Sequence, residues 1–464
     1  SHHIAHAASA FYTSGRAAAA IIVADGRGED VATTLAVGGP GGIEVIRTWG
    51  VEASLGHLYG WSADWAGLSH WGAGKLMGLA AYGRPTQPVP LVAGEDGYDI
   101  VGGPSADYPV RHQFLLARRF LRSQFRQANY PFSSADNADV LAYADFAASV
   151  QHALEQAMLS LARLARRETG LDHLVLAGGV ALNCTANGKI HRSGIFEEIW
   201  VPPVPHDAGV SLGAALVADR AIRGMAAPPP RLAHAFWSPT AAGMNARVRE
   251  LLNDFQVDQY AEDELVDVVA RDLADGLVVG WARGRAEVGQ RALGARSILC
   301  DPRSRKALVR VNKIKDREPW RPLAPVLPVE EFNTFFDGPL SPLANFMLGA
   351  WPVRDSARSR IPAAVHVDGS ARPQVVGPEH SAYYGLLRAF EKLTGVPVLI
   401  NTSLNIAGEP MVYSAADAVD SFVRSDIDVL VLDDLVIRRP RRPSPSAVDL
   451  VDGSLSFTPW HART

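Results

Sequence analysis

The chain has 464 residues, of which 47% are hydrophobic and 20% are charged, as is usual for a soluble globular protein. This length allows two or three domains with ample cores. The formal net charge of −4 argues against general affinity for DNA or RNA. No apolar run approaches the roughly 18 residues that cross a bilayer. We therefore expect neither a nucleic-acid partner nor a membrane partner.

Two cysteines occur, Cys184 and Cys300. They are too few for a disulfide framework or a Cys-type zinc site, and they fit a reducing compartment. No signal-peptide pattern is visible, so the expected location is the cytoplasm. The oligomeric state does not follow from the sequence.

The first residues include His2 and His6, four positions apart. On a helix this spacing puts both imidazoles on one face, where they can share a metal ion, while His3 points elsewhere. Histidines at a terminus can equally belong to a tag or a frayed end. From these residues alone, both interpretations stay open.

Residues 17–24 predict a buried strand that ends at Asp25, beside Gly26. A carboxylate at a strand end next to glycine can ligate a metal or approach a phosphate, and it can equally belong to a hairpin turn. Residues 72–83 predict a glycine-hinged loop and a short helix. They lack the spacing of a Walker A phosphate-binding loop.

A long helix is predicted at 143–169 and a strand at 173–177, followed by Gly178, Gly179 and a further helix. A strand, a Gly-Gly turn and a helix N-terminus present backbone N–H groups that can hold a nucleotide or phosphate, although a Gly-Gly pair alone is a weak signal. A strand is predicted at 198–201, and Asp207 lies at the following strand-to-helix junction. There its side chain can cap the helix or act as a metal ligand.

The Pro-rich residues 226–239 predict a linker, with a second domain beginning near residue 245. The patterns there predict helices at 262–275 and 415–423 and strands at 277–281, 396–400 and 429–432. The strand predicted at 396–400 leads into a polar turn at 401–405, which is rich in hydrogen-bonding groups.

Positive charge is concentrated in residues 283–321, which hold twelve Lys or Arg and four Asp or Glu, a local charge of +8. Cations this dense repel one another unless an anion is near, which indicates an anion pocket. A solvated surface helix or a nucleic-acid patch are the alternatives. Small and apolar residues between the charges, such as Gly289 and Leu293, favour a packed turn.

Seven sequence blocks, taken together, resemble the O-carbamoyltransferases of antibiotic and nodulation-factor biosynthesis. The blocks are HHIAHAASAFY (2–12), GKLMGLAAYG (74–83), LAGGVALN (176–183), PHDAGVSLGAA (205–215), GWARGRAEVGQRALGARSILCDPR (280–303), NKIKDREPWRPLAP (312–325) and NTSLN (401–405). Their order and spacing match across nearly the whole chain. No single block is decisive, but the ordered set is highly specific.

The resemblance implies an α/β fold in two domains. Residues 1–225 would form an actin/sugar-kinase-like ATPase-type domain, as in tRNA threonylcarbamoyl-transfer enzymes, and 226–244 a linker. Residues 245–440 would form an α/β acyl-adenylate-forming domain like threonylcarbamoyl-AMP synthase, followed by a tail at 441–464. Family members carry further residues before the HxxxH block, including the first strands of the ATPase-type fold. We therefore expect a sheet with an open edge.

The resemblance also implies two active sites, one in each domain. His2 and His6 would be catalytic in the first, and Arg291, Lys315 and Arg321 in the second. A divalent metal, Fe(II) or a similar ion, would grip a nucleotide phosphate, and two imidazoles with carboxylates suit such an ion. Its ligands would be His2, His6 and Asp207, with Asp25 a less certain fourth. The nucleotide pocket would be lined by Gly178, Gly179, Val180 and Asn183. Carbamoyl phosphate, beside ATP with or without Mg²⁺, would be bound by Arg291, Lys315, Arg321, Arg372, Asn401 and Ser403.

The implied activity is ATP-dependent conversion of carbamoyl phosphate to carbamoyl-adenylate, followed by carbamoyl transfer to a hydroxyl of a small natural product. The sequence does not identify that acceptor. One departure is Gln290, where the family usually has proline, which loosens a turn but removes no ligand.

Three alternatives remain: a hydrogenase-maturation enzyme, a tRNA-modifying enzyme and a non-catalytic nucleotide-sensing protein. The first normally carries zinc-finger modules, for which two cysteines are too few. The second needs a polyanion-binding surface, which a net charge of −4 disfavours.

Overall fold

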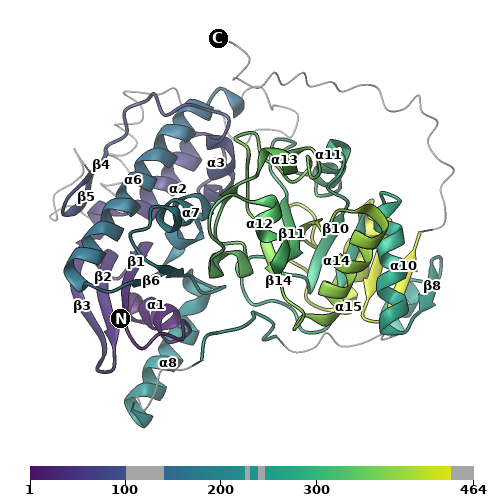
Figure 1. The fold of residues 1–464 in the computed structure, drawn as a ribbon, viewed down its shortest axis with the longest axis horizontal. Coiled ribbons are helices and arrows are strands. Elements are labelled where there is room, and N and C mark those ends of the chain that lie inside the picture. Colours follow the sequence, from purple (N-terminus) through teal and green to yellow (C-terminus); the bar gives the residue numbers. More distant parts are fainter. Residues whose placement is uncertain (101–139, 225–229, 239–245, 440–464) are drawn as a thin grey trace.

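The computed structural model describes residues 1–100, 140–224, 230–238 and 246–439, so the predicted tail and parts of the predicted linker lie outside it. The described chain forms two halves that lie side by side, each built around one large β-sheet (Figure 1). Among the described residues, no helix combines the length and the apolarity that a bilayer crossing requires.

The first half is built on a five-stranded sheet. Its elements are β1 Ala19–Gly28, β2 Val31–Gly39, β3 Gly42–Gly50, β6 His173–Ala177, β7 Glu198–Trp200, α1 His2–Phe11, α2 Leu55–Trp65 and α6 Ala144–Thr169. The strand order is β3-β2-β1-β6-β7, with β1 to β3 antiparallel and β6 and β7 parallel to β1. Residues 19–25 of β1 are all buried because helices cover the sheet, with α1, α2 and α6 all in contact with β1.

Shorter elements complete this half. They are α3 Ala73–Ala80, β4 Leu91–Gly94, β5 Gly97–Ile100, α7 Cys184–Arg192 and α8 Val210–Arg223. α3 and α7 both pack against α6, and α8 packs against α1. The long helix α6 ends at Gly170, whose φ of 66° is a left-handed conformation that glycine adopts without strain.

The second half is built on an eight-stranded sheet. Its strands are β8 Gln256–Gln259, β9 Val279–Ala282, β10 Arg296–Cys300, β11 Ala324–Pro328, β14 Gln374–Val376, β15 Leu399–Ser403, β16 Val429–Leu432 and β17 Leu435–Arg438, in the order β14-β11-β15-β10-β9-β16-β17-β8. Its helices are α9 Ala246–Leu251, α10 Glu262–Ala274, α11 Arg305–Ile314, α14 Ser381–Thr394 and α15 Ala415–Arg424. α10 and α14 pack together in one apolar cluster, and α9, α11 and α15 belong to a second.

The two halves share apolar packing and polar contacts. The segment between β11 and β14 contributes α12 Phe332–Phe335, α13 Asp355–Arg358 and the hairpin of β12 Trp351–Pro352 and β13 Ser370–Ala371. Its buried side chains join the core cluster of the first sheet. Asn187 Nδ2 donates to the Leu348 carbonyl over 2.9 Å, and the Ala350 N–H donates to the Cys184 carbonyl over 3.0 Å. The junction is therefore a packed interface.

The structure confirms the α/β class and most of the predicted elements. It corrects two local predictions and, for Asp207, excludes one of two open alternatives. Asp25 does not end its strand, because β1 continues through a bulge to Gly28. The predicted polar turn at 401–405 begins inside β15, whose residues 401–403 pair with β10. Asp207 starts a 3₁₀ turn before α8 and forms no side-chain cap hydrogen bond there.

Candidate active site

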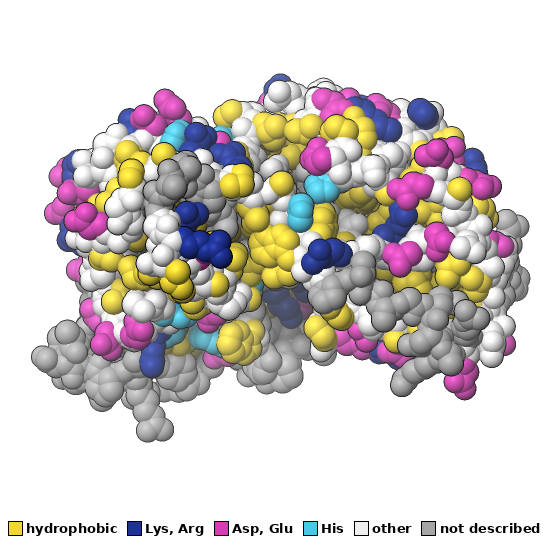
Figure 2. Space-filling model, turned by 90° about the horizontal axis from the view of Figure 1, so that it is seen from below, with side chains coloured by type: hydrophobic (Ala, Val, Ile, Leu, Met, Phe, Trp, Pro, Cys, Tyr) yellow, Lys and Arg dark blue, Asp and Glu magenta, His cyan; other side chains and the backbone are white. Residues whose placement is uncertain are grey.

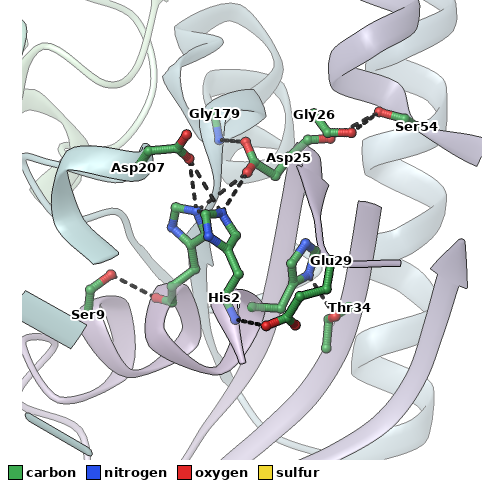
Figure 3. A network of polar contacts seen from close by, with 11 residues as sticks. His2, Ser9, Asp25, Gly26, Glu29, Thr34, Ser54, Gly179 and Asp207 are labelled. Carbon is green, nitrogen blue, oxygen red and sulfur yellow. Dashed lines mark hydrogen bonds and ion pairs between the residues drawn. The ribbon is translucent and has the colours of Figure 1, made fainter. Parts of the chain in front are cut away.

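Four side chains from three segments converge in the first half (Figure 3). His2 and His6 lie one turn apart on α1, with their Nε2 atoms 3.0 Å apart. Asp25 Oδ2 lies 3.2 Å from His2 Nε2 and 3.5 Å from His6 Nε2. Asp207 Oδ1 lies 3.5 and 3.4 Å from the same two nitrogens. Of the described residues, these four alone form a group that could hold a metal ion.

The donor set and its spacing fit a transition-metal ion. Two atoms that each lie ~2.1 Å from one metal ion are ~3.0 Å apart at a right angle and ~3.4 Å apart at a tetrahedral angle. The nitrogen–nitrogen and nitrogen–oxygen spacings of the cluster run from 3.0 to 3.5 Å. Two imidazoles and two carboxylates suit Fe(II), Zn²⁺ and similar ions better than Mg²⁺.

The surroundings hold this cluster in place. His6 is fully buried, and Asp25 is 7% exposed. Burial alone would raise the pKa of Asp25, but hydrogen bonds from His6 and the Gly179 N–H hold it well below its usual range. His3 faces away, and its Nδ1 lies 2.8 Å from Thr34 Oγ1. The prediction that His2 and His6 share a face while His3 does not is therefore correct in its geometry.

The predicted nucleotide loop touches this cluster. The Gly179 N–H donates to Asp25 Oδ1 over 2.8 Å. A Cβ at Gly178, whose φ is 87°, would lie 2.2 Å from the Ala24 carbonyl oxygen, so only glycine fits there. Val180 follows in the 3₁₀ turn Gly179–Leu182 and is buried.

The side chain of Asn183 stabilises the end of this loop and the start of α7. Its Oδ1 accepts the Ala186 N–H over 3.0 Å and thereby caps α7. Its Nδ2 donates to Gln151 Oε1 over 2.9 Å, in a buried network with Tyr59. The side chain is 7% exposed, so its contribution to nucleotide binding stays a prediction.

A cavity of about 270 Å³ lies where the two halves meet. The first half contributes Gly74, Met77 and Gly78 at α3, and Cys184 and Thr185 at α7. The second half contributes five of the six residues predicted to bind carbamoyl phosphate. These are Arg291, Arg321, Arg372, Asn401 and Ser403. Residues more than 300 positions apart in the sequence therefore line one cavity.

The arginines of this cavity crowd one another. Burial lowers the pKa of Arg291 to about 9, and the positive charges of Arg372 and Arg321 add to that effect. Burial and Arg321 likewise lower the pKa of Arg372. Within the described ranges, no carboxylate lies within ion-pair distance of Arg291 or Arg372, and Arg291 Nε is buried without a hydrogen-bond partner. Half-buried cations without an acidic partner favour the binding of an anion in this cavity.

Lys315 is not among the residues that line the cavity, but it contacts Ser403, which is. Its Nζ donates to Asn405 Oδ1 over 2.7 Å, to the Asn405 carbonyl over 3.0 Å and to both oxygens of Ser403. An ammonium has three N–H bonds, so these acceptors use all of them. Burial lowers the pKa of Lys315 well below its usual value, with Arg317 and Arg321 adding to the effect. Lys315 therefore holds the turn that follows β15, and direct contact with carbamoyl phosphate stays a prediction.

The sequence analysis missed some residues of the cavity. Arg317 lines it, and burial together with Arg321 lowers its pKa to about 9. Its position between two predicted ligands was the available signal. Other cations of the basic segment are neutralised on the surface: Arg303 pairs with Asp301 and Arg310 with Asp428, both at 2.6 Å.

One face of the molecule shows how positive and negative side chains are distributed over the surface. On the face shown in Figure 2, the coloured Lys and Arg side chains are scattered among Asp and Glu. A nucleic-acid surface would instead gather cations along one stripe.

The family follows from comparison with known proteins. Residues 1–216 match the carbamoyltransferase N-terminus and residues 270–439 match the carbamoyltransferase C-terminus. The chain belongs to the carbamoyltransferase family, a family of enzymes, as the sequence blocks predicted.

Named relatives agree with this assignment. Nodulation protein NolNO of Sinorhizobium fredii is 40% identical over 99% of this chain and 66% of its own length. Nodulation protein NolO of Bradyrhizobium diazoefficiens is 37% identical over 94% of this chain and 78% of its own length. The 3'-hydroxymethylcephem-O-carbamoyltransferase of Amycolatopsis lactamdurans is 34% identical over 75% of this chain and 61% of its own length. The chain thus spans from 61% to 78% of the length of these three relatives.

Likeness to solved structures is weak. The crystal structure of P. abyssi Sua5 complexed with L-threonine overlaps 38% of this chain and 48% of that chain, with 15% identity and a TM-score of 0.29. An overlap of that quality supports no argument about the site.

Proposed function

We propose that this protein is an ATP-dependent O-carbamoyltransferase that forms carbamoyl-adenylate and transfers its carbamoyl group to a hydroxyl of a small molecule. The observation that carries the proposal is the cavity between the halves, where Arg291 and Arg372 have no acidic partner among the described residues. Carbamoyl phosphate is a small dianion, and arginine forks bind phosphate oxygens bidentately. The family membership supports a carbamoyl donor.

The first reaction forms carbamoyl-adenylate, and its substrates and products balance as follows. Carbamoyl phosphate, ATP and one water give carbamoyl-adenylate, pyrophosphate and inorganic phosphate. Water releases the phosphate and leaves carbamate, whose oxygen forms the new bond to the α-phosphorus of ATP as the bond to pyrophosphate breaks. Arg291, Arg321 and Arg372 bind the phosphate oxygens and stabilise the charge that develops on them.

The second reaction is proposed for the His2–His6–Asp25–Asp207 cluster, beside the loop at Gly178 and Gly179. The acceptor oxygen attacks the carbamoyl carbon, and AMP leaves. Backbone N–H groups of the loop would hold the nucleotide phosphate. A divalent metal ion, Fe(II) in our proposal, would supply positive charge next to that phosphate.

We propose one domain for each of the two reactions. We assign residues 1–225 to an actin/sugar-kinase-like domain, and the strand order β3-β2-β1-β6-β7 with its antiparallel and parallel parts supports this. We assign residues 245–440 to an acyl-adenylate-forming domain. Its mixed sheet, which carries Asn401 and Ser403 on β15 at the cavity, supports that assignment.

Two substitutions separate the two reactions. Arg321→Ala should reduce pyrophosphate release from carbamoyl phosphate and ATP by on the order of 100-fold, about 3 kcal/mol. His6→Ala should release pyrophosphate at the normal rate and fail to carbamoylate an acceptor. Arg303→Ala is the matched control, because Arg303 belongs to the same segment but pairs with Asp301 outside the cavity. Loss of both reactions in folded His6→Ala protein would refute the assignment of two sites.

The acceptor can be found by mass spectrometry. The names of the relatives point to a cephem hydroxymethyl group for one and to nodulation for the others. A panel of hydroxylated sugars, aminoglycosides, macrolides and cephems should yield one product heavier by ~43 Da, as expected when an activated hydroxyl takes up a carbamoyl group. No mass gain on any hydroxylated compound would contradict the proposal of a small-molecule acceptor.

A further inference from the structure

Beside the arginines, the side-chain amide of Asn401 forms part of the cavity wall, and it is hydrogen-bonded to a second buried amide, that of Gln374. We infer that Gln374 is a positioning residue that fixes the amide of Asn401 with its oxygen free, so that the site recognises the –NH₂ group of a carbamoyl phosphate and rejects acyl phosphates that lack it. This inference rests on the proposed function and adds the basis of its donor specificity.

The two amides are hydrogen-bonded to each other and to the backbone. Asn401, on β15, is 1% exposed, and Gln374, on β14, is 4% exposed. Asn401 Nδ2 donates to Gln374 Oε1 over 2.7 Å and to the Ala292 carbonyl over 3.1 Å. Gln374 Nε2 donates to the Leu293 carbonyl over 2.7 Å. The chain of bonds therefore has a backbone carbonyl at each end.

These end points determine which way both amides face. A carbonyl oxygen can only accept, so Gln374 must turn its nitrogen toward Leu293 and its oxygen toward Asn401. Asn401 must then turn its nitrogen toward Gln374 and Ala292. Flipping Asn401 would place oxygen against oxygen at two contacts, and flipping Gln374 would place oxygen against oxygen at Leu293 and nitrogen against nitrogen at Asn401. The orientation thus follows from hydrogen-bond donors and acceptors alone.

One group is left over. Asn401 Oδ1 is buried and has no hydrogen-bond partner among the described residues, and Asn401 lines the cavity together with Arg291 and Arg372. A buried acceptor without a donor destabilises the structure by roughly 1–3 kcal/mol, so a ligand that supplies a donor gains that energy. The side chain can offer a ligand an acceptor and nothing else.

The chemistry of the ligand then decides what the acceptor recognises. A phosphate dianion has oxygens that only accept, and these match the arginines. The –NH₂ of carbamoyl phosphate donates, whereas the methyl group of acetyl phosphate does not. A site built to hydrogen-bond an N–H rejects the isostere without it far more strongly than an apolar pocket rejects an extra methylene. Gln374 contacts Asn401 and not the ligand, so its effect passes through the Asn401 amide.

Two stable phosphonates of the same shape test this. Phosphonoacetamide carries –CO–NH₂ and acetonylphosphonate carries –CO–CH₃, and their dissociation constants are measured by calorimetry on the whole protein. Wild type should bind the amide about 10-fold or more tightly than the ketone. Gln374→Met, which keeps the volume but loses both hydrogen bonds, should bring that ratio close to one. Gln374→Glu should keep most of the ratio at a pH where its carboxyl group is protonated, because one oxygen then accepts from Asn401 Nδ2 and the O–H donates to the Leu293 carbonyl.

The outcomes separate this inference from the proposed function. Inorganic phosphate should bind wild type and Gln374→Met within about 2-fold, since the arginines are unchanged and no charge is added, and thermal unfolding checks that each variant is folded. Equal binding of the two phosphonates by wild type would overturn the inference while leaving the anion site intact. A folded Gln374→Glu variant that loses the ratio would overturn the role of Gln374, even if Gln374→Met does not fold. Absence of binding of every phosphonate and of phosphate would overturn the proposed function itself.

Discussion

At the scale of single residues, the cavity holds cations whose repulsion is not relieved by acids. Besides burial, the charges of Arg372 and Arg321 lower the pKa of Arg291, and that of Arg321 lowers the pKa of Arg372. No carboxylate within the described ranges pairs with Arg291 or Arg372. Such an arrangement destabilises the empty protein and is relieved when an anion binds. Removing one of these charges should therefore stabilise the empty protein and weaken its binding of an anion.

Replacing Arg372 by methionine tests this opposition. The variant should raise the free energy of unfolding of the empty protein by on the order of 1 kcal/mol, because one of the repelling charges is gone. It should also weaken binding of inorganic phosphate by about 10-fold or more. Urea unfolding and calorimetric titration measure the two effects. An empty variant less stable than wild type that still binds phosphate normally would contradict the account.

Lys315→Met should have the opposite effect on stability. Its ammonium donates to Ser403 and Asn405, so its loss leaves buried acceptors unpaired. We expect the free energy of unfolding to fall by on the order of 2 kcal/mol. The same urea unfolding experiment measures this change. A stabilised Lys315→Met variant would instead place Lys315 with the repelling cations of the cavity.

At the scale of elements, α1 and α3 carry side chains that hold the two sites in place. α1 carries two of the four candidate metal ligands one turn apart, so helix geometry alone sets their spacing. Across the junction, Lys75 on α3 forms an ion pair of 2.6 Å with Glu318, which also lies 3.5 Å from Arg321 Nη1. One carboxylate thus connects the first half to an arginine of the cavity.

Metal binding by α1 can be measured without any substrate. Stoichiometric Co²⁺ should raise the unfolding temperature of wild type, and a chelator should reverse the shift, because an ion that binds only the folded state stabilises it. His6→Ala should abolish the shift. His3→Gln is the matched control, since His3 faces Thr34 and should leave metal binding unchanged. Equal loss in both variants would indicate damage to the helix rather than loss of a ligand.

Removing the charge of Glu318 should affect phosphate binding more than stability. Glu318→Gln keeps the shape of the side chain while removing a negative charge next to the anion site. Affinity for inorganic phosphate should rise about 3-fold or more. The free energy of unfolding should fall by no more than about 1 kcal/mol, as for other partly exposed ion pairs. Weaker phosphate binding would mean that the contact with Lys75 positions Arg321.

The helices and strands also show which features of the fold could be predicted from the sequence. The apolar pattern predicted α6 to within one residue at its start, and the four-residue spacing of His2 and His6 predicted their shared face. Polar side chains misled the strand predictions. Asp25, Asn401 and Ser403 looked like turn residues, yet all three lie within strands. Asn401 and Ser403 pair with β10, and Asp25 lies in the bulge of β1.

At the scale of the whole molecule, the cavity exists only where the halves meet. Arg372 and Asn401 lie far from Arg291 in the sequence, so their meeting was predictable from family resemblance and not from local patterns. The same holds for Lys315, whose positive charge is visible in the sequence but whose enclosure by Ser403 and Asn405 depends on tertiary packing. The orientation of the two amides at Gln374 likewise requires coordinates.

The central claim is that carbamoyl phosphate triggers cleavage of ATP between its α- and β-phosphates. The most direct measurement incubates the whole protein with ATP, with and without carbamoyl phosphate and a hydroxylated acceptor, and separates the nucleotide products by chromatography. The account predicts AMP and pyrophosphate in equal amounts, formed only when carbamoyl phosphate is present. Formation of ADP, or consumption of ATP that does not depend on carbamoyl phosphate, would contradict it.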